Sequence, residues 1–460
     1  MKNVQKHIIH KVNVEVNVPD LPMARRIYNN ISGLLHSSIL PEIELQLNAA
    51  IAEQEYYRAD SFKIDLIFGS ESEMEKSAAP AISEEVKKRL RESLQRNMPG
   101  IDLMQADNEE KKIEKQTPAQ KKWEVFIAFL QTGRLPWYAA SIDLLKEEDL
   151  DDLISTGNKQ HSEMLKTVLS QNSLVAKRLV KQFPVSFILL LIEKLFSVHT
   201  QSYWERFIKI TSSLDSIEKR EAEETFVLKI LKLIPSDDKP AIKHEIEDYF
   251  GKNLSVTDAG LSKKQEQALK EIIPEANKKD DAKKRKLISF EEQDGMYVQN
   301  AGLILLQPFL QYFFKELDLL REDNFKDETS QQIAIHLLHY LATEKEQPFE
   351  YDLLFEKYLC GMVSNEPIER FIQLTEKMKE EAGHLLRAVI HHWKILKNTS
   401  PGGLREGFLQ RNGKLIIDSQ HKLIIENNAI DILLEKLPWS YSIITFPWME
   451  QVLYVDWRVG

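Results

Sequence analysis

Two histidines that lie three positions apart are the residues of this sequence best placed to bind a metal. A helix would put the imidazoles of His336 and His339 on one face. With a carboxylate such as Glu344 or Glu350, they could bind zinc or iron. The pair lacks the adjacent glutamate of the zincin pattern, and Leu337 and Leu338 continue an apolar helix. We therefore interpret both histidines as packing residues, and a metal-dependent enzyme is the weaker alternative.

The only cysteine, Cys360, offers little further chemistry. One thiol excludes an intrachain disulfide and a Cys-based structural zinc site. A catalytic thiol needs a nearby base and partial exposure, whereas we expect Cys360 to be a small core residue at a helix end. The sequence also lacks a phosphate-binding glycine loop and a Gly-x-Ser-x-Gly elbow. We predict no catalytic residues, no bound metal and no cofactor.

Pro-Trp dipeptides are the most distinctive motif of the sequence. They occur in LPW at residues 135–137 and 437–439 and in FPW at residues 446–448. Proline ends a helix and tryptophan supplies a large apolar surface, so these motifs could lock helix ends into the core. Exposed tryptophans could equally dock a partner protein. The candidate protein-contact residues are Trp137, Pro438, Trp439, Pro447, Trp448 and Trp457.

The charge of the chain argues against nucleic acid as a partner. The 460 residues include 61 Lys and Arg against 71 Asp and Glu, a formal net charge of −10. Such a chain lacks the positive field that attracts nucleic acid. Its most basic stretch, residues 278–286, has no aromatic side chains on which bases could stack. We interpret this stretch as part of a solvated linker.

No stretch approaches the ~20 apolar residues that a membrane-spanning helix needs. The longest apolar run, residues 185–192, is interrupted by Ser186 and followed by Glu193 and Lys194. The first 18 residues contain no apolar signal core of the usual length. We predict a cytoplasmic protein with no membrane span.

Hydrophobic periodicity predicts a helix-rich α+β fold with a small β-α-α-β unit at the N-terminus. Apolar residues alternate with polar ones at Val12, Val14, Val16 and Val18, and again at Phe62, Ile64, Leu66 and Phe68. Pro22 and Pro41 begin two helical patterns between these expected strands. Residues 1–69 are therefore expected to form the β-α-α-β unit, whose strands could pair with each other or with another copy.

The remaining chain is expected to form helical modules joined by charged linkers. We assign residues 70–122 to a linker with one amphipathic helix (83–98), 123–253 to a helical domain and 254–296 to a charged linker. Residues 297–460 form a C-terminal helical domain with short strands near residues 415–417, 423–425 and 452–457 and a Trp-rich tail. The most apolar stretch of the middle domain, residues 187–196, is its expected central helix.

An ordered series of motifs resembles the tape-measure protein family of extracellular contractile injection systems, which are phage-tail-like particles. It begins with HIIHKVNVEVNVPD (7–20), DSFKIDLIF (60–68) and FLQTGRLPWY (129–138). It continues through VQNAGLILLQPFL, AIHLLHYLATEK, EKYLCG, SPGGLREGFLQRNGKL, DILLEKLPW and FPWM after residue 297. Residues 70–120 and 250–295 carry no such motif.

The resemblance implies a protein without catalysis that sets tube length or supports assembly of the inner tube. Its implied partners are tube, baseplate and terminator proteins, and self-association is a further hypothesis. The implied location is the cytoplasm during assembly and then the particle. One unbroken helix of this length would span about 690 Å at roughly 1.5 Å per residue, which this proline-punctuated sequence does not predict. We favour an assembly factor; the alternative is an adaptor docked at one tube end through the Trp-rich C-terminus.

Overall fold

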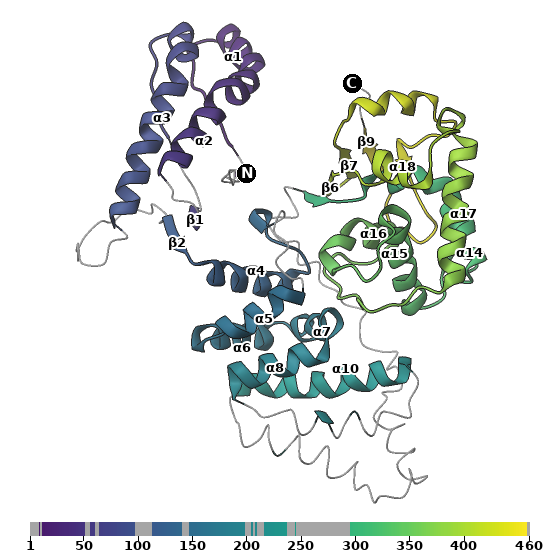
Figure 1. Ribbon diagram of the computed structural model, residues 1–460. Coiled ribbons are helices and arrows are strands. Elements are labelled where there is room, and N and C mark those ends of the chain that lie inside the picture. The colour runs from purple at the N-terminus through teal and green to yellow at the C-terminus, as the bar shows by residue number, and fades with distance from the viewer. Residues whose placement is uncertain are drawn as a thin grey trace, which may run out of the picture. The chain divides into compact units, whose positions relative to one another are not determined.

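The computed structural model describes residues 9, 12–50, 56–59, 64–96, 113–139, 147–197, 204, 205, 208, 216–236, 244 and 295–457. The chain divides into two compact units, residues 1–125 with 136–153 and residues 126–135 with 154–460. Helices predominate, and most of the short strands lie near the C-terminus (Figure 1). The expected helix-rich α+β class is therefore confirmed.

The first unit begins with helices that bury little apolar surface. These are α1 (Leu21–Leu34), a π-helical turn (Leu35–Ile39), α2 (Leu40–Ala50) and α3 (Glu71–Arg96). The Asp20 side chain caps α1 by accepting from the Met23 amide at 2.8 Å, with Pro22 in the first turn. Helices α2 and α3 pack together. Among the described residues up to Arg96, the buried hydrophobic side chains are Ile27, Ile39, Ala78 and Val86.

The two strands expected in this region are not formed. Residues 12–18 and 64–68 have no regular secondary structure, and residues 62 and 63 lie outside the described residues. Val12, Val14 and Val16 are 40–47% exposed. Alternation produces a strand only where a neighbouring edge accepts its backbone hydrogen bonds, and among the described residues no strand pairs with residues 12–18. The pair that does form is β1 (Tyr56–Ala59) with β2 (Ile113–Gln116), antiparallel.

The helix expected at residues 83–98 begins earlier, within α3. Ser70 accepts from the Glu73 amide at 3.2 Å, and Glu73 accepts from the Gly69 amide at 2.8 Å. This reciprocal cap begins the helix at Glu71, and Pro80 is accommodated inside it. The rest of the first unit contains β2, the start of α4 (Pro118–Thr132), a 3-10 turn at Trp137–Ala139 and the start of α5 (Glu147–Thr156).

The second unit contains α6 (Lys159–Gln171), α7 (Ser173–Gln182), α8 (Val185–Phe196) and α10 (Ser216–Leu233). The Asn172 side chain accepts from the Leu174 amide at 2.9 Å, which begins α7 where α6 ends. Helix α8 confirms the apolar helix expected at residues 187–196. Its Phe187 packs with Phe183, at a ring distance of 5.2 Å, and with Phe126 at 6.2 Å.

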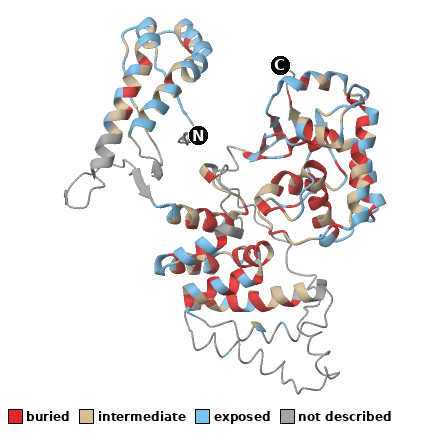
Figure 2. Cartoon of the chain, in the orientation of Figure 1, coloured by how far each residue is buried: buried red, intermediate tan, exposed pale blue. Residues whose placement is uncertain are grey.

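Residues 295–457 of the second unit form one dense α+β region, rich in buried side chains (Figures 1 and 2). Its longer helices are α14 (Gln307–Glu316), α15 (Glu328–Thr343) and α17 (Glu376–His392). Short helical turns include α16 (Leu354–Leu359), α18 (Pro401–Leu404), η4 (Ala301–Leu306), η5 (Glu350–Leu353), η7 (Arg405–Leu409) and η8 (Ala429–Lys436). Strands β4 (Leu320–Arg321) and β5 (Asn324–Phe325) form a small hairpin.

A five-stranded sheet lies in this region, in the order β3-β6-β7-β9-β8. The strands are β3 (Met296–Val298), β6 (Gly413–Ile417), β7 (His421–Ile425), β8 (Ile443–Ile444) and β9 (Leu453–Asp456). Neighbours are antiparallel except for β7 and β9. The strands expected near residues 415–417, 423–425 and 452–457 are therefore confirmed. Among the described residues, no helix is both long enough and apolar enough to cross a membrane.

Candidate functional site

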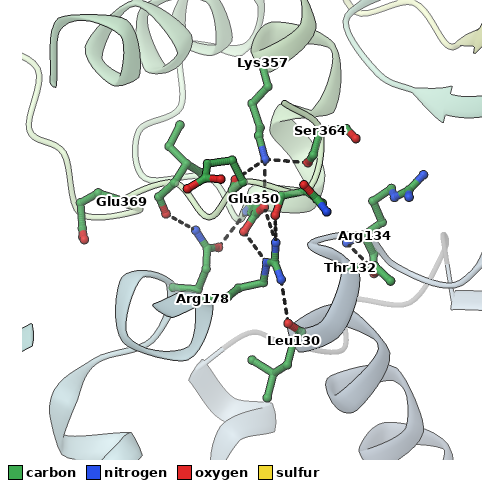
Figure 3. A network of polar contacts seen from close by, with 12 residues as sticks. Leu130, Thr132, Arg134, Arg178, Glu350, Lys357, Ser364 and Glu369 are labelled. Carbon is green, nitrogen blue, oxygen red and sulfur yellow. Dashed lines mark hydrogen bonds and ion pairs between the residues drawn. The ribbon is translucent and has the colours of Figure 1, made fainter. Parts of the chain in front are cut away.

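The most distinctive site in the second unit is a buried network of charged side chains (Figure 3). Glu350 lies between Arg178 and Lys357, and all three side chains are at most 1% exposed. Arg178 donates from Nε to Glu350 Oε2 at 2.8 Å and from Nη2 to Oε1 at 3.2 Å. Lys357 Nζ lies 2.9 Å from Oε1. Arg178 and Glu350, which are 172 positions apart in the chain, are thus joined by a bidentate ion pair.

The cluster contains two cations but only one carboxylate. Backbone carbonyls therefore accept the remaining hydrogen bonds of Arg178 and Lys357. Arg178 Nη1 donates to Leu130 O at 2.7 Å, and Nη2 donates to Asn365 O. Lys357 Nζ donates to Ser364 O at 2.7 Å and to Glu366 O at 2.6 Å. Burial lowers the pKa of Lys357, and the adjacent Glu350 opposes that shift. Removing Glu350 would leave two buried cations without a carboxylate, and an unpaired buried charge typically costs about 3–5 kcal/mol.

Helix periodicity explains how Arg178 enters the core. Val175, Arg178 and Gln182 share one face of α7, and all three are buried. Gln182 Nε2 donates to Ile368 O at 2.8 Å, and its Oε1 accepts from the Glu350 amide at 2.8 Å. Gly133, with φ +73°, leaves room for the cluster, since a Cβ there would lie 2.3 Å from Glu350 Oε1.

A second polar contact joins α10 to the segment around Glu369. Arg220 Nη2 lies 3.3 and 3.4 Å from the two Glu369 carboxylate oxygens, and its Nε lies 3.5 Å from Glu224 Oε1. Burial, followed by the hydrogen bond with Glu224, raises the pKa of Glu369 to about 8. The helices at residues 159–233 are thus held to residues 295–457 by specific polar contacts as well as by apolar packing.

The predicted protein-contact tryptophans are mostly tied into the fold. Trp439 Nε1 donates to Leu305 O at 3.0 Å, and Trp448 Nε1 donates to Leu359 O at 2.9 Å. Both rings are half-buried, whereas Trp457 is buried and donates to Asp431 Oδ2 at 3.0 Å. Pro438 and Pro447 are exposed. Trp137 begins a 3-10 turn, and its side chain lies outside the described part.

Comparison with protein families identifies the chain. The family model for contractile injection system tape measure proteins matches residues 6–457. The chain belongs to this tape measure family. Neither a curated protein nor a solved structure matches it. The match includes the entire charged network described above.

Two of the motifs on which the resemblance to the tape measure family rests make structural contacts in this chain. Arg405 Nε donates to Leu341 O at 3.1 Å, and Gln410 Nε2 donates to Ala342 O at 2.8 Å, so both cover carbonyls at the end of α15. Gly302 packs directly on backbone, because a Cβ there would lie 1.7 Å from Phe408 O. These residues account for the GGLREGFLQ and NAGLILL motifs as packing features.

The histidines considered as metal ligands form separate contacts in this tape measure protein. His336 Nε2 lies 2.8 Å from Glu369 O, and burial lowers the pKa of His336 to about 4. His339 Nδ1 lies 3.4 Å from Glu356 Oε1, which also accepts from Asn300 Nδ2 at 2.8 Å. Among the described residues, no group of three His, Cys, Asp or Glu side chains could hold a metal ion.

Cys360 lies in the core at the C-terminal end of α16, as expected. Burial, and to a smaller extent Glu356, raises the pKa of its thiol. The thiol is therefore protonated at neutral pH and poorly suited to nucleophilic chemistry.

The sequence pattern gave no indication of the charged network. Arg178 and Glu350 are too far apart in the chain for any local spacing to pair them. The one local signal is the 3.6-residue period that places Arg178 on the same face as Val175 and Leu179, which are buried in α7. A buried arginine requires an acidic partner, but sequence alone could not select which one.

Proposed function

We propose that this tape measure family protein supports assembly of the inner tube of a contractile injection particle and catalyses no reaction. The observation that carries the proposal is the family match over residues 6–457. The buried Arg178–Glu350–Lys357 network adds a physical argument, since it ties α7 to residues 350–357 and so supports a folded body that can present surfaces to other proteins. Tube, baseplate and terminator proteins are the proposed partners, and the particle interior is the proposed location.

Assembly support fits the geometry better than length measurement by extension. Among the described residues, the longest helix is α3, whose 26 residues span about 39 Å at roughly 1.5 Å per residue. The predicted linker at 254–296 lies mostly outside the described part. The charged network joins residues on both sides of this linker, so a longer linker would not move those two regions apart.

Particle length in cells with altered linkers tests this proposal. Residues 256–290 are deleted in one variant and duplicated in another, and particle number and length are measured by electron microscopy. We expect particles of unchanged length, and no particles when the whole gene is deleted. A length change that follows the linker length would support the ruler function instead. Assembled particles and unfinished tubes are also purified separately, and we expect the protein in both fractions.

An adaptor that docks through the C-terminal tryptophan motifs is the second candidate. It is favoured by the exposure of Pro438 and Pro447 beside half-buried Trp439 and Trp448. Because both indole N–H groups donate within the fold, Trp448→Ala would damage packing as well as docking. The better variants are Pro438→Ala and Pro447→Ala. If either one dissociates the protein from particles without lowering its melting temperature, the adaptor function is supported.

A further inference from the structure

The last turns of α17 and the residues that follow them carry a basic strip on the surface of the second unit. The stretch between Glu381 and Glu406 contains no aspartate or glutamate, although 71 of the 460 residues of the chain are acidic. Its exposed basic side chains, which we call the basic strip, are those of His384, Arg387, His391, His392, Lys394 and Lys397. The remaining basic residue, Arg405, is buried and pairs with Glu344.

Helix periodicity gathers much of the basic strip on one side of α17. His384, Arg387 and His391 follow one another at spacings of three and four residues, so they share the exposed face of the helix. The opposite face contains Leu386 and Val389, which are fully buried in the core. The basic side chains therefore project away from the region that stabilises the fold.

Stabilisation of the helix does not account for the whole basic strip. Cations favour the C-terminal end of a helix through its dipole, but this effect falls off within the last turn. Arg387 lies before the last turn of α17, and Lys394 and Lys397 lie beyond its end at His392. Among the described residues, none of these three cations has a carboxylate partner. Their charges are therefore available to another molecule.

Aromatic rings border the basic strip where α14 packs beside α17 (Figure 1). The ring centroid of Phe309 lies 5.8 Å from that of His392 and 5.2 Å from that of Trp439. Phe309 and Trp439 are half-buried, and Ile395 within the stretch is 48% exposed. Aromatic side chains and arginine are both enriched in protein interfaces, so this margin offers apolar contact beside the charges.

Charge complementarity indicates the chemistry of the partner. Exposed cations without partners attract an acidic surface, which speeds association and fixes its orientation. Nucleic acid is the other anion that such a strip attracts, but the net charge of −10 on the chain opposes a long polyanion. A short acidic protein segment avoids this repulsion, because its few carboxylates meet only the basic strip.

We propose that the basic strip and its aromatic margin bind an acidic segment of another protein of the contractile injection particle. This inference rests on the proposed function, which supplies the class of partner. Carboxylates of the segment pair with Arg387 and Lys394, and an apolar residue between them packs on Phe309 and Trp439. His391 lies between the two cations in the chain, near the centre of the contact.

A photo-crosslinking amino acid at His391 tests this contact in cells that assemble the particle. His391 is replaced by p-benzoylphenylalanine in the full chain, and the crosslinked peptides are identified by mass spectrometry after irradiation. The control carries the same substitution at Lys377, which is exposed on α17 about 21 Å away at roughly 1.5 Å per residue. Nuclease treatment of the products detects crosslinks to nucleic acid.

We expect position 391 to crosslink to a segment of a particle protein in which carboxylates outnumber basic residues. Its yield should exceed that of the control about fivefold, and Arg387→Glu with Lys394→Glu should abolish the difference. Arg387→Lys with Lys394→Arg keeps both charges and should keep most of the yield. Circular dichroism checks that each variant is folded, and the crosslink from the otherwise unaltered strip does not depend on these variants.

Several outcomes would overturn the inference. They are a crosslink to a second copy, to nucleic acid or to a segment without an excess of carboxylates, equal yields at the two positions, or no crosslink. In each of these cases, co-purification of the chain with particle proteins would leave the proposed function intact. A crosslink to an acidic segment of a protein from outside the particle would overturn the proposed function and, with it, the class of partner.

Discussion

The helices of residues 12–96 and the α+β region of residues 295–457 differ sharply in how they are stabilised. In the first region, few side chains are buried, and Tyr28, Leu45 and Ile67 are 80, 58 and 98% exposed. The second has one continuous core from Met296 to Trp457 (Figure 2). It also contains the buried carboxylate of Glu350, which pairs with Lys357 and with Arg178 of α7. The difference indicates that the C-terminal region is stabilised by its own core, whereas few buried side chains stabilise the described N-terminal helices.

The largest expected loss of stability follows from removing the buried carboxylate of Glu350. Glu350→Ala should destabilise the second unit by about 3–5 kcal/mol, because Arg178 and Lys357 would remain buried without their partner. Urea unfolding measures the change. Glu328→Ala is the control, since that carboxylate is 66% exposed and pairs with Lys181 at 3.7 Å, and we expect a change within ~0.5 kcal/mol. Equal losses in both variants would contradict this interpretation of the network.

A smaller loss of stability should follow from adding a methyl group where two backbone segments are in contact. Gly302→Ala would place its Cβ 1.7 Å from Phe408 O, and backbone cannot move aside cheaply. We expect a loss of about 2–3 kcal/mol by overpacking, measured by thermal unfolding. Gly407→Ala is the matched control, because its Cβ would make an ordinary contact with Ile430 Cδ1 at 3.6 Å. A Gly302→Ala protein as stable as the control would show that the close approach is relaxed in solution.

A pair of truncations should measure the contrast between the regions directly. Leu386→Ala in the C-terminal core should cost near the top of the ~2–5 kcal/mol range for buried aliphatic residues. Ile27→Ala should lower the stability by an amount near the lower end of this range, because few side chains surround the cavity that the substitution would leave. Hydrogen exchange in the helix that carries each residue measures both effects separately. Similar losses of stability at the two sites would contradict the proposed difference in packing between the two regions.

A further expected effect is a pH dependence of stability at Glu369. Its folded-state pKa of about 8 exceeds the ordinary value of 4.5, so the folded chain binds this proton more tightly than the unfolded chain. The resulting stability is fully present below about pH 4.5 and is lost as pH rises towards 8. The groups around the carboxyl are Arg220, Glu224 and the Phe371 amide. Glu369→Gln should flatten the unfolding profile between pH 5 and 8, and an unchanged profile would contradict the assignment.

The sequence predicted features that depend on neighbours in the chain. Helix α8, the helix that begins near Pro22 and the C-terminal strands follow from local periodicity and helix-start chemistry, as does the burial of Cys360. The strand expected at residues 12–18 is absent because pairing depends on an edge supplied by distant residues.

The charged network could not be predicted from the sequence, because it also depends on residues that are distant in the chain. A helix face can show that Arg178 is buried, but only the tertiary structure places Glu350 and Lys357 beside it. The tryptophan motifs were assigned two functions from sequence, and the indole hydrogen bonds to Leu305 and Leu359 account for the structural one. Docking through these motifs stays a prediction.

The central claim is that the helices of residues 159–233 and the region of residues 295–457 form one body across the linker. A protease site inserted between residues 256 and 280 tests it directly, when the cleaved chain is analysed by size-exclusion chromatography. We predict that the two fragments elute together in equal amounts, and that Glu350→Ala weakens their association. Separate elution of the fragments from the otherwise unaltered chain would contradict the account.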